Sequence, residues 1–171
     1  MDIDSPNQLP VLHVRLKSQL HVGPNAVTRD GLIKDVDERV VVKTFPAGQR
    51  AFALDEARLI TLAECGDLVP AILGIFYHGD NDSETHVVFK WCGTAPKTFC
   101  DLPLTDKLLI KNAFEKLHEE GIWHGDVEPR NVVKDAATGK WTVVDFGEAT
   151  THICEGPTCS ELVQLEKDLS F

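Results

Sequence analysis

The stretch Ile122–Gly147 reads IWHGDVEPRNVVKDAATGKWTVVDFG, and it decides the fold expected of this chain. His124-Gly125-Asp126 lies near its start, Asn131 follows five residues after the aspartate, and Asp145-Phe146-Gly147 ends it after an apolar, β-branched run. Carboxylate and amide oxygens are ligands that Mg²⁺ accepts, and a carboxylate can also take a proton from an attacking hydroxyl. We therefore interpret Asp126 as a candidate base and Asn131 and Asp145 as candidate metal ligands.

The residues between these motifs are predicted to form a hairpin. Segments 131–134 and 141–144 are rich in valine, and the polar turn 135–139 between them ends in glycine. A hairpin of this kind would hold Asn131 and Asp145 side by side at its open end. For either motif taken alone, an ordinary hairpin with polar ends is the alternative interpretation.

In order and separation, the two motifs resemble the H-R-D-x-x-x-x-N catalytic loop and the D-F-G segment of protein kinases. The resemblance covers about residues 20 to 150 and is weaker in its first half. It implies an α+β, protein-kinase-like bilobal fold. An antiparallel-sheet small lobe is expected at 11–90, a hinge and reduced helical large lobe at 91–171, and a flexible N-terminal lead at 1–10. ATP and Mg²⁺ are the implied cofactors.

In the implied small lobe, one lysine would position the phosphates and one glutamate would hold that lysine. Arg39–Phe45 resembles the V-A-I-K strand, whose lysine reaches the α- and β-phosphates, and Lys43 has that position. The helix predicted over Gln49–Cys65 resembles kinase helix C. Its Glu56 matches the glutamate that pairs with the strand lysine better than Glu64 does. A surface lysine and an exposed helix carboxylate are the alternatives.

Other nucleotide contacts are implied by position. Strand-like segments at 11–16 and 21–33 are interrupted by turns at 23–25 and 29–31, where a glycine-rich loop would be expected. Only Gly23 offers the backbone freedom that such a loop uses, and Pro24 after it lacks an amide hydrogen that could face a phosphate. A plain turn glycine is the alternative for Gly23. We expect a simplified lid.

The hinge is the remaining nucleotide contact. Two strands are predicted at 71–77 and 85–91. In a kinase-like fold the second strand leads into the hinge, where backbone groups of Lys90 to Cys92 would face the adenine edge.

Helical patterns predict which faces are buried. Residues 105–120 resemble kinase helix E and carry an apolar stripe of Leu108, Leu109, Ala113, Phe114 and Leu117. The helix at 49–65 carries a stripe of Phe52, Leu59, Ile60, Leu62 and Ala63. His118 and His124 lie at the exit of the first of these helices and are expected to be structural, with His124 orienting backbone around the D-F-G segment.

Only twenty-four residues follow Gly147, whereas protein kinases continue into the helices that bind a peptide substrate. Thr158–Glu161 is interpreted as a capping box ahead of Leu162, Leu165 and Leu169. We expect a short amphipathic helix that covers helix 105–120, with a protein partner on that helix as the alternative.

The same tail contains three potential zinc ligands, His152, Cys154 and Cys159. They lack a clear fourth ligand and a C-x-x-C pair. Buried or free thiols are therefore favoured over a metal.

Composition limits the partners and the compartment. The formal net charge is −10 with no run of Lys or Arg, which argues against nucleic-acid binding and favours a basic or amine-bearing partner. No apolar run is long enough to span a membrane, and the acidic N-terminus is unlike a secretory signal. Five cysteines without a disulfide pattern favour a reducing, intracellular location, cytoplasmic or nuclear.

Three departures from the protein-kinase pattern affect the implied acceptor. Gly125 replaces the arginine of H-R-D, as in aminoglycoside phosphotransferases and choline-type kinases. Glu128 replaces the lysine of serine/threonine kinases, and Arg130 lies where tyrosine kinases carry an arginine that can steady the phosphoryl group.

The function implied is an ATP- and Mg²⁺-dependent phosphotransferase acting on a protein hydroxyl or a small molecule. A pseudokinase or nucleotide-binding regulatory module is the alternative, as is an ATPase subunit completed by a partner protein.

Overall fold

The computed structural model describes residues 12–34, 36–63, 65–77 and 83–170. The predicted N-terminal lead, Glu64 and most of the predicted loop at 79–83 lie outside these ranges. The described chain has a mixed α+β fold, with a five-stranded antiparallel sheet and three α-helices, which confirms the predicted fold class at this level. In these ranges no helix has the length and apolar character needed to cross a bilayer.

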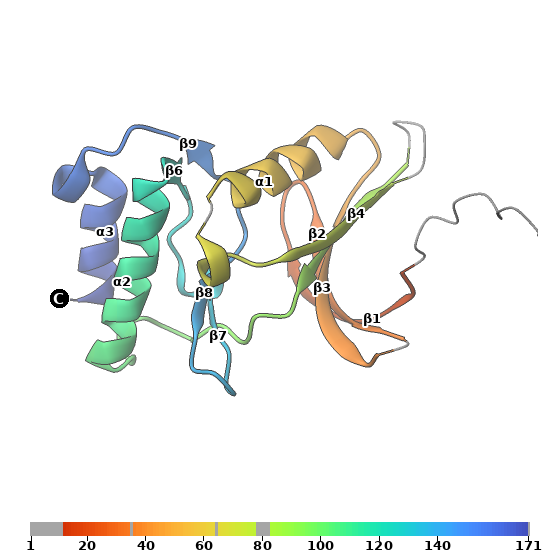
Figure 1. Cartoon of the computed structure of the whole chain (residues 1–171), viewed down its shortest axis with the longest axis horizontal. Helices are drawn as coiled ribbons and strands as arrows, with labels where there is room; N and C mark the ends of the chain where they lie inside the picture. Colours follow the sequence, from red (N-terminus) through yellow and green to blue (C-terminus); the bar gives the residue numbers. More distant parts are fainter. Residues whose placement is uncertain (1–11, 35, 64, 78–82, 171) are drawn as a thin grey trace, which may run out of the picture.

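The sheet forms one end of the molecule (Figure 1). Its strands are β1 (Val14–Val22), β2 (Val27–Ile33), β3 (Glu38–Phe45), β4 (Ile72–Tyr77) and β5 (Thr85–Lys90), in the order β1-β2-β3-β5-β4. The central strand β3 is the β-branched stretch that contains Lys43. Because β3 is paired on both sides, two ladders of backbone hydrogen bonds fix the position of the Lys43 backbone in the sheet.

The predicted turn at 29–31 is wrong, because these residues lie inside β2. Asp30 is buried, but its carboxylate accepts hydrogen bonds from the backbone and side chain of Ser18 and from Arg39. Gly31 pairs with Leu16, and a Cβ at Gly31 would lie 2.8 Å from a methyl carbon of Val14. The glycine therefore permits close approach of β1 and does not mark a turn.

Helix α1 (Arg50–Leu62) packs on the sheet and is followed by a 3₁₀ turn at Gly66–Leu68. The predicted stripe is partly wrong: Leu59 and Ile60 are buried, whereas Phe52 and Leu62 are about half exposed. Small residues, Ala53 and Ala57, occupy the centre of the buried face instead, together with Glu56. Small side chains allow the helix to lie close to the sheet, and this brings Glu56 within reach of β3.

Helices and a hairpin form the other end of the molecule (Figure 1). The elements are α2 (Leu104–Glu119), β6 (Ile122–Trp123), a 3₁₀ turn (Pro129–Asn131), β7 (Val132–Lys134), β8 (Trp141–Val143), β9 (Thr150–Thr151), a 3₁₀ turn (Gly156–Thr158) and α3 (Ser160–Leu169). Strands β7 and β8 pair antiparallel, and β6 pairs with β9. The predicted hairpin is confirmed to within one residue at each strand.

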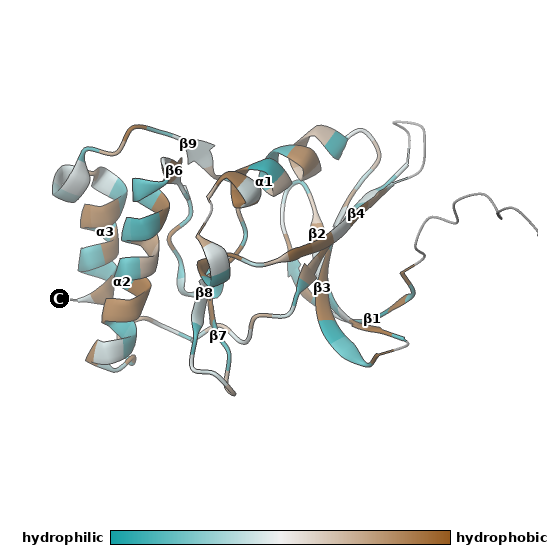
Figure 2. Ribbon diagram, viewed as in Figure 1, coloured by the Kyte–Doolittle hydropathy of each residue, from teal (hydrophilic) through white to brown (hydrophobic). Residues whose placement is uncertain are grey.

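Helix α3 packs against α2, which confirms the predicted intramolecular cover. Figure 2 shows hydrophobic residues interspersed with hydrophilic ones along both helices. The buried hydrophobic residues are Ile110, Ala113, Phe114, Leu117, Leu162, Leu165 and Leu169. Leu108 and Leu109, predicted on the buried stripe of α2, are about half exposed because the buried face is centred on Phe114.

The predicted capping box is also wrong. The N-cap of α3 is Cys159, which makes no side-chain capping bond within the described ranges, and the side chain of Glu161 is 4% exposed and faces inward.

Candidate functional site

Lys43, Glu56 and Asp145 form one ion cluster between the sheet and the hairpin. The Lys43 Nζ donates to Glu56 Oε1 at 2.9 Å and to Asp145 Oδ1 at 2.6 Å. Lys43 comes from β3, Glu56 from α1, and Asp145 from the segment after β8, 102 residues from the lysine in sequence. The pairing of Lys43 with Glu56 was predicted, and the direct bond to Asp145 was not.

The pKa values in this cluster keep the lysine charged. Burial alone would lower the pKa of Lys43, but the two carboxylates outweigh it and the net pKa is raised. Burial would raise the pKa of Asp145, and the charge and hydrogen bond of Lys43 lower it below its usual range. For Glu56 burial dominates, so its pKa is raised despite the lysine.

Asp126 lies on the loop after β6 and is held by two neighbours. Arg130 donates from one guanidinium nitrogen to both carboxylate oxygens, at 3.0 and 2.8 Å. The Asn131 amide nitrogen donates to Asp126 Oδ2 at 2.8 Å and to the Asp126 backbone carbonyl at 2.9 Å. The amide of Asn131 thus turns its nitrogen toward Asp126 and presents its oxygen elsewhere.

The loop and the hairpin are joined through His124, which is fully buried. Its Nε2–H donates to the Val144 carbonyl at 3.1 Å, and its Nδ1 accepts the Asp126 backbone N–H at 3.3 Å. Its ring contacts Phe114 and Phe146 edge-on. Burial lowers the pKa of His124, consistent with a neutral ring that donates on one side and accepts on the other. The structural role predicted for His124 is confirmed.

Two residues at the site have left-handed backbone. Asp145 has φ 64°, which is costly for a residue with a Cβ and occurs mainly at functional sites. Gly125 has φ 83°, and a Cβ there would lie 2.5 Å from the Glu148 carbonyl oxygen. The glycine in place of the arginine of H-R-D is therefore required by this close approach of two backbone segments.

Two adjoining cavities meet at the ion cluster. The smaller, about 330 Å³, is lined by Lys43, Asp126, Arg130, Asp145 and the β1–β2 turn. The larger, about 450 Å³, is lined by apolar residues including Val41, Ile60, Phe89, Val133 and Val144. Lys43, Glu56 and Asp145 line both cavities. A polar chamber thus opens beside an apolar one, with the ion cluster at the junction.

The remaining residues predicted to contact a nucleotide line one cavity or the other. Lys90, Cys92 and Asn131 line the apolar cavity, as Asp145 does. Gly23 lines the polar cavity, but its N–H donates to the Ala26 carbonyl at 2.9 Å within the turn. The turn covers the cavity without presenting that amide to it.

Glu161 was not identified from the sequence, although it supports the whole loop. Its carboxylate accepts the backbone N–H of Gly125 at 2.7 Å and of His124 at 3.0 Å, and it contacts His118 Nε2 at 2.6 Å. Burial would raise the pKa of Glu161, but the hydrogen bonds from His118 and the two amides lower it below its usual range. The available signal was its spacing: Glu161 lies four and eight residues before Leu165 and Leu169, on the buried stripe.

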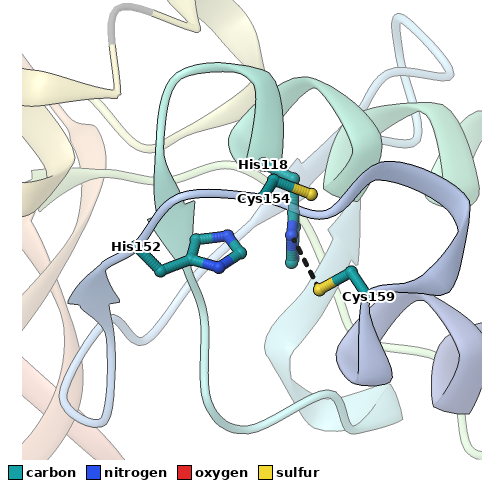
Figure 3. Close-up of side chains that lie close together, drawn as sticks. All are labelled: His118, His152, Cys154 and Cys159. Atoms are coloured by element: carbon teal, nitrogen blue, oxygen red, sulfur yellow. Dashed lines mark hydrogen bonds between the residues drawn. The ribbon is translucent and has the colours of Figure 1, made fainter.

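His152, Cys154 and Cys159 lie together, and the structure adds His118 of α2 as a fourth metal-binding side chain. One potential ligand atom from each of the four lies within 4.8 Å of the others (Figure 3). His118 was predicted to be only structural, and this placement gives it a second possible use.

A scan of the chain against protein-family models finds no match. A search of curated proteins finds no significant relative either.

Proposed function

We propose that this protein is an ATP- and Mg²⁺-dependent phosphotransferase with a protein-kinase-like bilobal fold, which transfers the γ-phosphate to a hydroxyl of a protein or a small molecule. The observation that carries the proposal is the Lys43–Glu56–Asp145 cluster. Phosphoryl transfer in kinases requires a strand lysine paired with a helix glutamate and a D-F-G aspartate that holds Mg²⁺, and here the three corresponding side chains lie together.

The two cavities support the same proposal. An apolar cavity of about 450 Å³ is large enough for a nucleoside and is lined by Lys90 and Cys92, whose backbone groups are proposed to meet the base edge. The polar cavity next to it suits the phosphates, because Lys43 and Arg130 both line it. Lys43, at the junction, would hold the α- and β-phosphates.

The residues where the two cavities meet fit the chemistry. The side chain of Asp145 is about one-third exposed and lines the polar cavity. The amide nitrogen of Asn131 makes the hydrogen bond to Asp126, so the amide oxygen does not take part in that bond. These two oxygens would hold Mg²⁺, which neutralises charge on the β- and γ-phosphates. Asp126 would accept the proton of the acceptor hydroxyl, and Asn131 and Arg130 orient its carboxylate.

The contacts of Arg130 favour a second candidate function, a nucleotide-binding module that does not transfer phosphate. Its guanidinium covers both oxygens of Asp126 and also approaches Glu128 at 3.7 Å. For phosphate transfer, Arg130 must break its hydrogen bond to one carboxylate oxygen of Asp126, so that this oxygen can accept the proton of the acceptor hydroxyl. Its side chain is about half exposed, so it can turn toward the phosphates at low cost.

Phosphate transfer separates these candidates. We expect purified protein to release labelled phosphate from [γ-³²P]ATP to water or to an acceptor, and Asp126→Ala to reduce this rate by about 10²- to 10⁴-fold while nucleotide affinity stays within about threefold. Asp101→Ala, an exposed aspartate on the loop before α2, is the matched control and should be unchanged.

Equal rates for Asp126→Ala and wild type would exclude Asp126 as the base. If the wild-type protein binds ATP but shows no turnover with a broad mixture of acceptors, the result would favour the module that does not transfer phosphate. Turnover that appears only on adding a cell extract would favour an ATPase or kinase subunit completed by a partner protein. A reducing intracellular compartment suits every case, since none of the five cysteines forms a disulfide.

A further inference from the structure

Four metal-binding side chains from three separate segments meet beside the end of α2. His118 lies in the last turn of α2, His152 and Cys154 follow β9, and Cys159 directly precedes α3. Their potential ligand atoms lie within 4.8 Å of one another (Figure 3). In a tetrahedral zinc site with bonds of about 2.0–2.3 Å, ligand atoms are about 3.3–3.8 Å apart. A contraction of about 1 Å, within reach of side-chain rotation, would close the site.

The donor set selects the metal. Two sulfurs and two imidazole nitrogens form a Cys₂His₂ set, the composition of structural zinc sites. Thiolate ligands favour zinc over magnesium or calcium, which prefer oxygen. Four residues separate Cys154 from Cys159, within the spacing common for zinc-binding cysteine pairs.

His118 is already oriented as a zinc ligand. Its Nε2 lies 2.6 Å from Glu161 Oε2, so this nitrogen carries the proton and donates to the carboxylate. Its Nδ1 then presents a lone pair and lies 3.5 Å from the Cys159 sulfur (Figure 3). A histidine that binds zinc through one nitrogen and donates to a carboxylate through the other is the usual arrangement in zinc proteins.

His152 and Cys154 complete the set. The Nε2 of His152 is buried and has no hydrogen-bond partner among the residues that the structure describes. A buried polar atom in that state costs free energy unless something binds it. The His152 ring stands at 88° to the His118 ring, with centroids 4.6 Å apart. The Cys154 sulfur accepts the Gly156 backbone N–H at 3.3 Å, which helps to fix the position of the sulfur.

We propose that His118, His152, Cys154 and Cys159 bind one Zn²⁺ in a closed, four-coordinate structural site. Binding releases the two thiol protons to solvent. The metal would join the segment after β9 and the start of α3 to α2. Among the described residues, the strand pairing in this region is limited to the two-residue ladder of β6 with β9. This inference stands apart from the proposed phosphotransfer.

The site is also connected to the loop that carries Asp126. Glu161 accepts from the zinc ligand His118 and from the backbone N–H groups of His124 and Gly125. Ordering of His118 by the metal therefore fixes the carboxylate that holds the loop. Glu161 acts here as a positioning residue.

Metal content tests the site directly. Untagged protein expressed with added zinc should retain about one Zn²⁺ per chain by mass spectrometry after dialysis. Protein stripped with EDTA should bind Co²⁺ and develop the visible bands of tetrahedral cobalt and a sulfur-to-cobalt charge-transfer band. The double variant Cys154→Ser/Cys159→Ser should lose the metal and both signals, and the exposed Cys100→Ser should keep them.

Three results would overturn the proposal. The first is wild-type protein that neither retains zinc nor takes up Co²⁺ after stripping. The second is a double variant that retains as much zinc as wild type. The third is wild-type protein that is isolated without metal and whose thiol count rises by two on reduction, which would assign Cys154 and Cys159 to a disulfide.

A second pair of variants tests the role of Glu161. Glu161→Gln should weaken Zn²⁺ binding about 10- to 100-fold in competition with a chelator, because glutamine does not accept the His118 proton as strongly. Glu166→Gln, exposed on the same helix, should bind zinc like wild type. Equal affinities for the two variants would contradict the link between Glu161 and the metal.

Discussion

Two buried glutamates, Glu56 and Glu161, support the candidate site in different ways. Glu56 is 4% exposed and directs a side chain, the ammonium group of Lys43. Glu161 is 5% exposed and directs backbone, through the amides of His124 and Gly125, with His118 as a third partner. One carboxylate therefore aims a charge at the cavity, and the other sets the shape of the loop beside it.

The balance between burial and hydrogen-bond donors accounts for their opposite pKa shifts. For Glu56, burial is the largest effect and raises the pKa, against the opposing effects of Lys43, which Glu56 shares with Asp145, and of the Phe146 backbone N–H. For Glu161, the hydrogen bonds from His118 and from the backbone N–H groups of Gly125 and His124 overcome burial and lower the pKa. A buried carboxylate whose donors outweigh burial contributes to stability, whereas one for which burial dominates costs stability and is kept for the position of its partner.

Removal of Glu161 is expected to have the largest effect. Glu161→Ala leaves His118 and two backbone amides without their buried acceptor, which should cost about 3–5 kcal/mol of unfolding free energy. At roughly 2–4 °C per kcal/mol, the midpoint should fall by about 6–20 °C. Denaturant unfolding of Glu161→Ala and of the exposed Glu166→Ala provides the comparison, and a similar small change in both would show that the loop does not depend on Glu161.

Asp106 provides a second carboxylate with several donors and should behave like Glu161. It accepts from Lys134 Nζ at 2.8 Å and from Trp141 Nε1 at 3.1 Å, which joins α2 to the hairpin. The Lys134 hydrogen bond lowers the pKa of Asp106, against burial, and the Trp141 bond adds to this. Asp106→Asn should therefore cost about 1–3 kcal/mol at pH 7.

The sign of the pH dependence follows from the lowered pKa of Asp106. Its contribution is complete above the unfolded pKa of about 3.9 and is lost as the pH falls through the lower folded pKa. The difference between wild type and Asp106→Asn should thus shrink between about pH 4 and pH 2. A difference that stays constant over this range in chemical denaturation would show that the charge of Asp106 contributes nothing.

Glu56 should show the smallest effect on stability and a clear effect on binding. Glu56→Gln removes a costly buried charge while Lys43 keeps its bond to Asp145, so the unfolding free energy should change by less than about 1 kcal/mol. Under the proposed function, a less firmly held Lys43 should weaken ATP binding about tenfold, or ~1.4 kcal/mol. Calorimetric titration measures this, and a large loss of stability with unchanged affinity would reverse the assigned roles of the two glutamates.

Much of this arrangement could be predicted from local patterns. The hairpin, the helix with Glu56 and the strand with Lys43 follow from runs of β-branched residues, helical periodicity and fixed offsets between motifs. The direct bond from Lys43 to Asp145 joins residues 102 positions apart, and no local pattern specifies its length. The predicted turn at 29–31 was wrong because tertiary partners satisfied Asp30 inside a strand.

The Glu161 network lay beyond local reasoning for a different reason. His118 lies four residues after Phe114 on α2, and Glu161 lies four residues before Leu165 on α3, so both polar residues are on apolar stripes. Each by itself is consistent with an exposed residue at a helix end. Only the packing of α3 on α2 shows that the two stripes face each other and that the polar pair is buried between them.

The central claim, a magnesium-dependent nucleotide site at Lys43 and Asp145, is tested most directly by the thermal unfolding midpoint with and without ATP and MgCl₂. At about 100 times its dissociation constant, a ligand adds roughly 2.7 kcal/mol, which should raise the midpoint by about 5–10 °C. This rise should require magnesium, persist in Asp101→Ala and disappear in Asp145→Ala. An unchanged midpoint with every nucleotide tested, or an equal rise in Asp145→Ala, would contradict the claim.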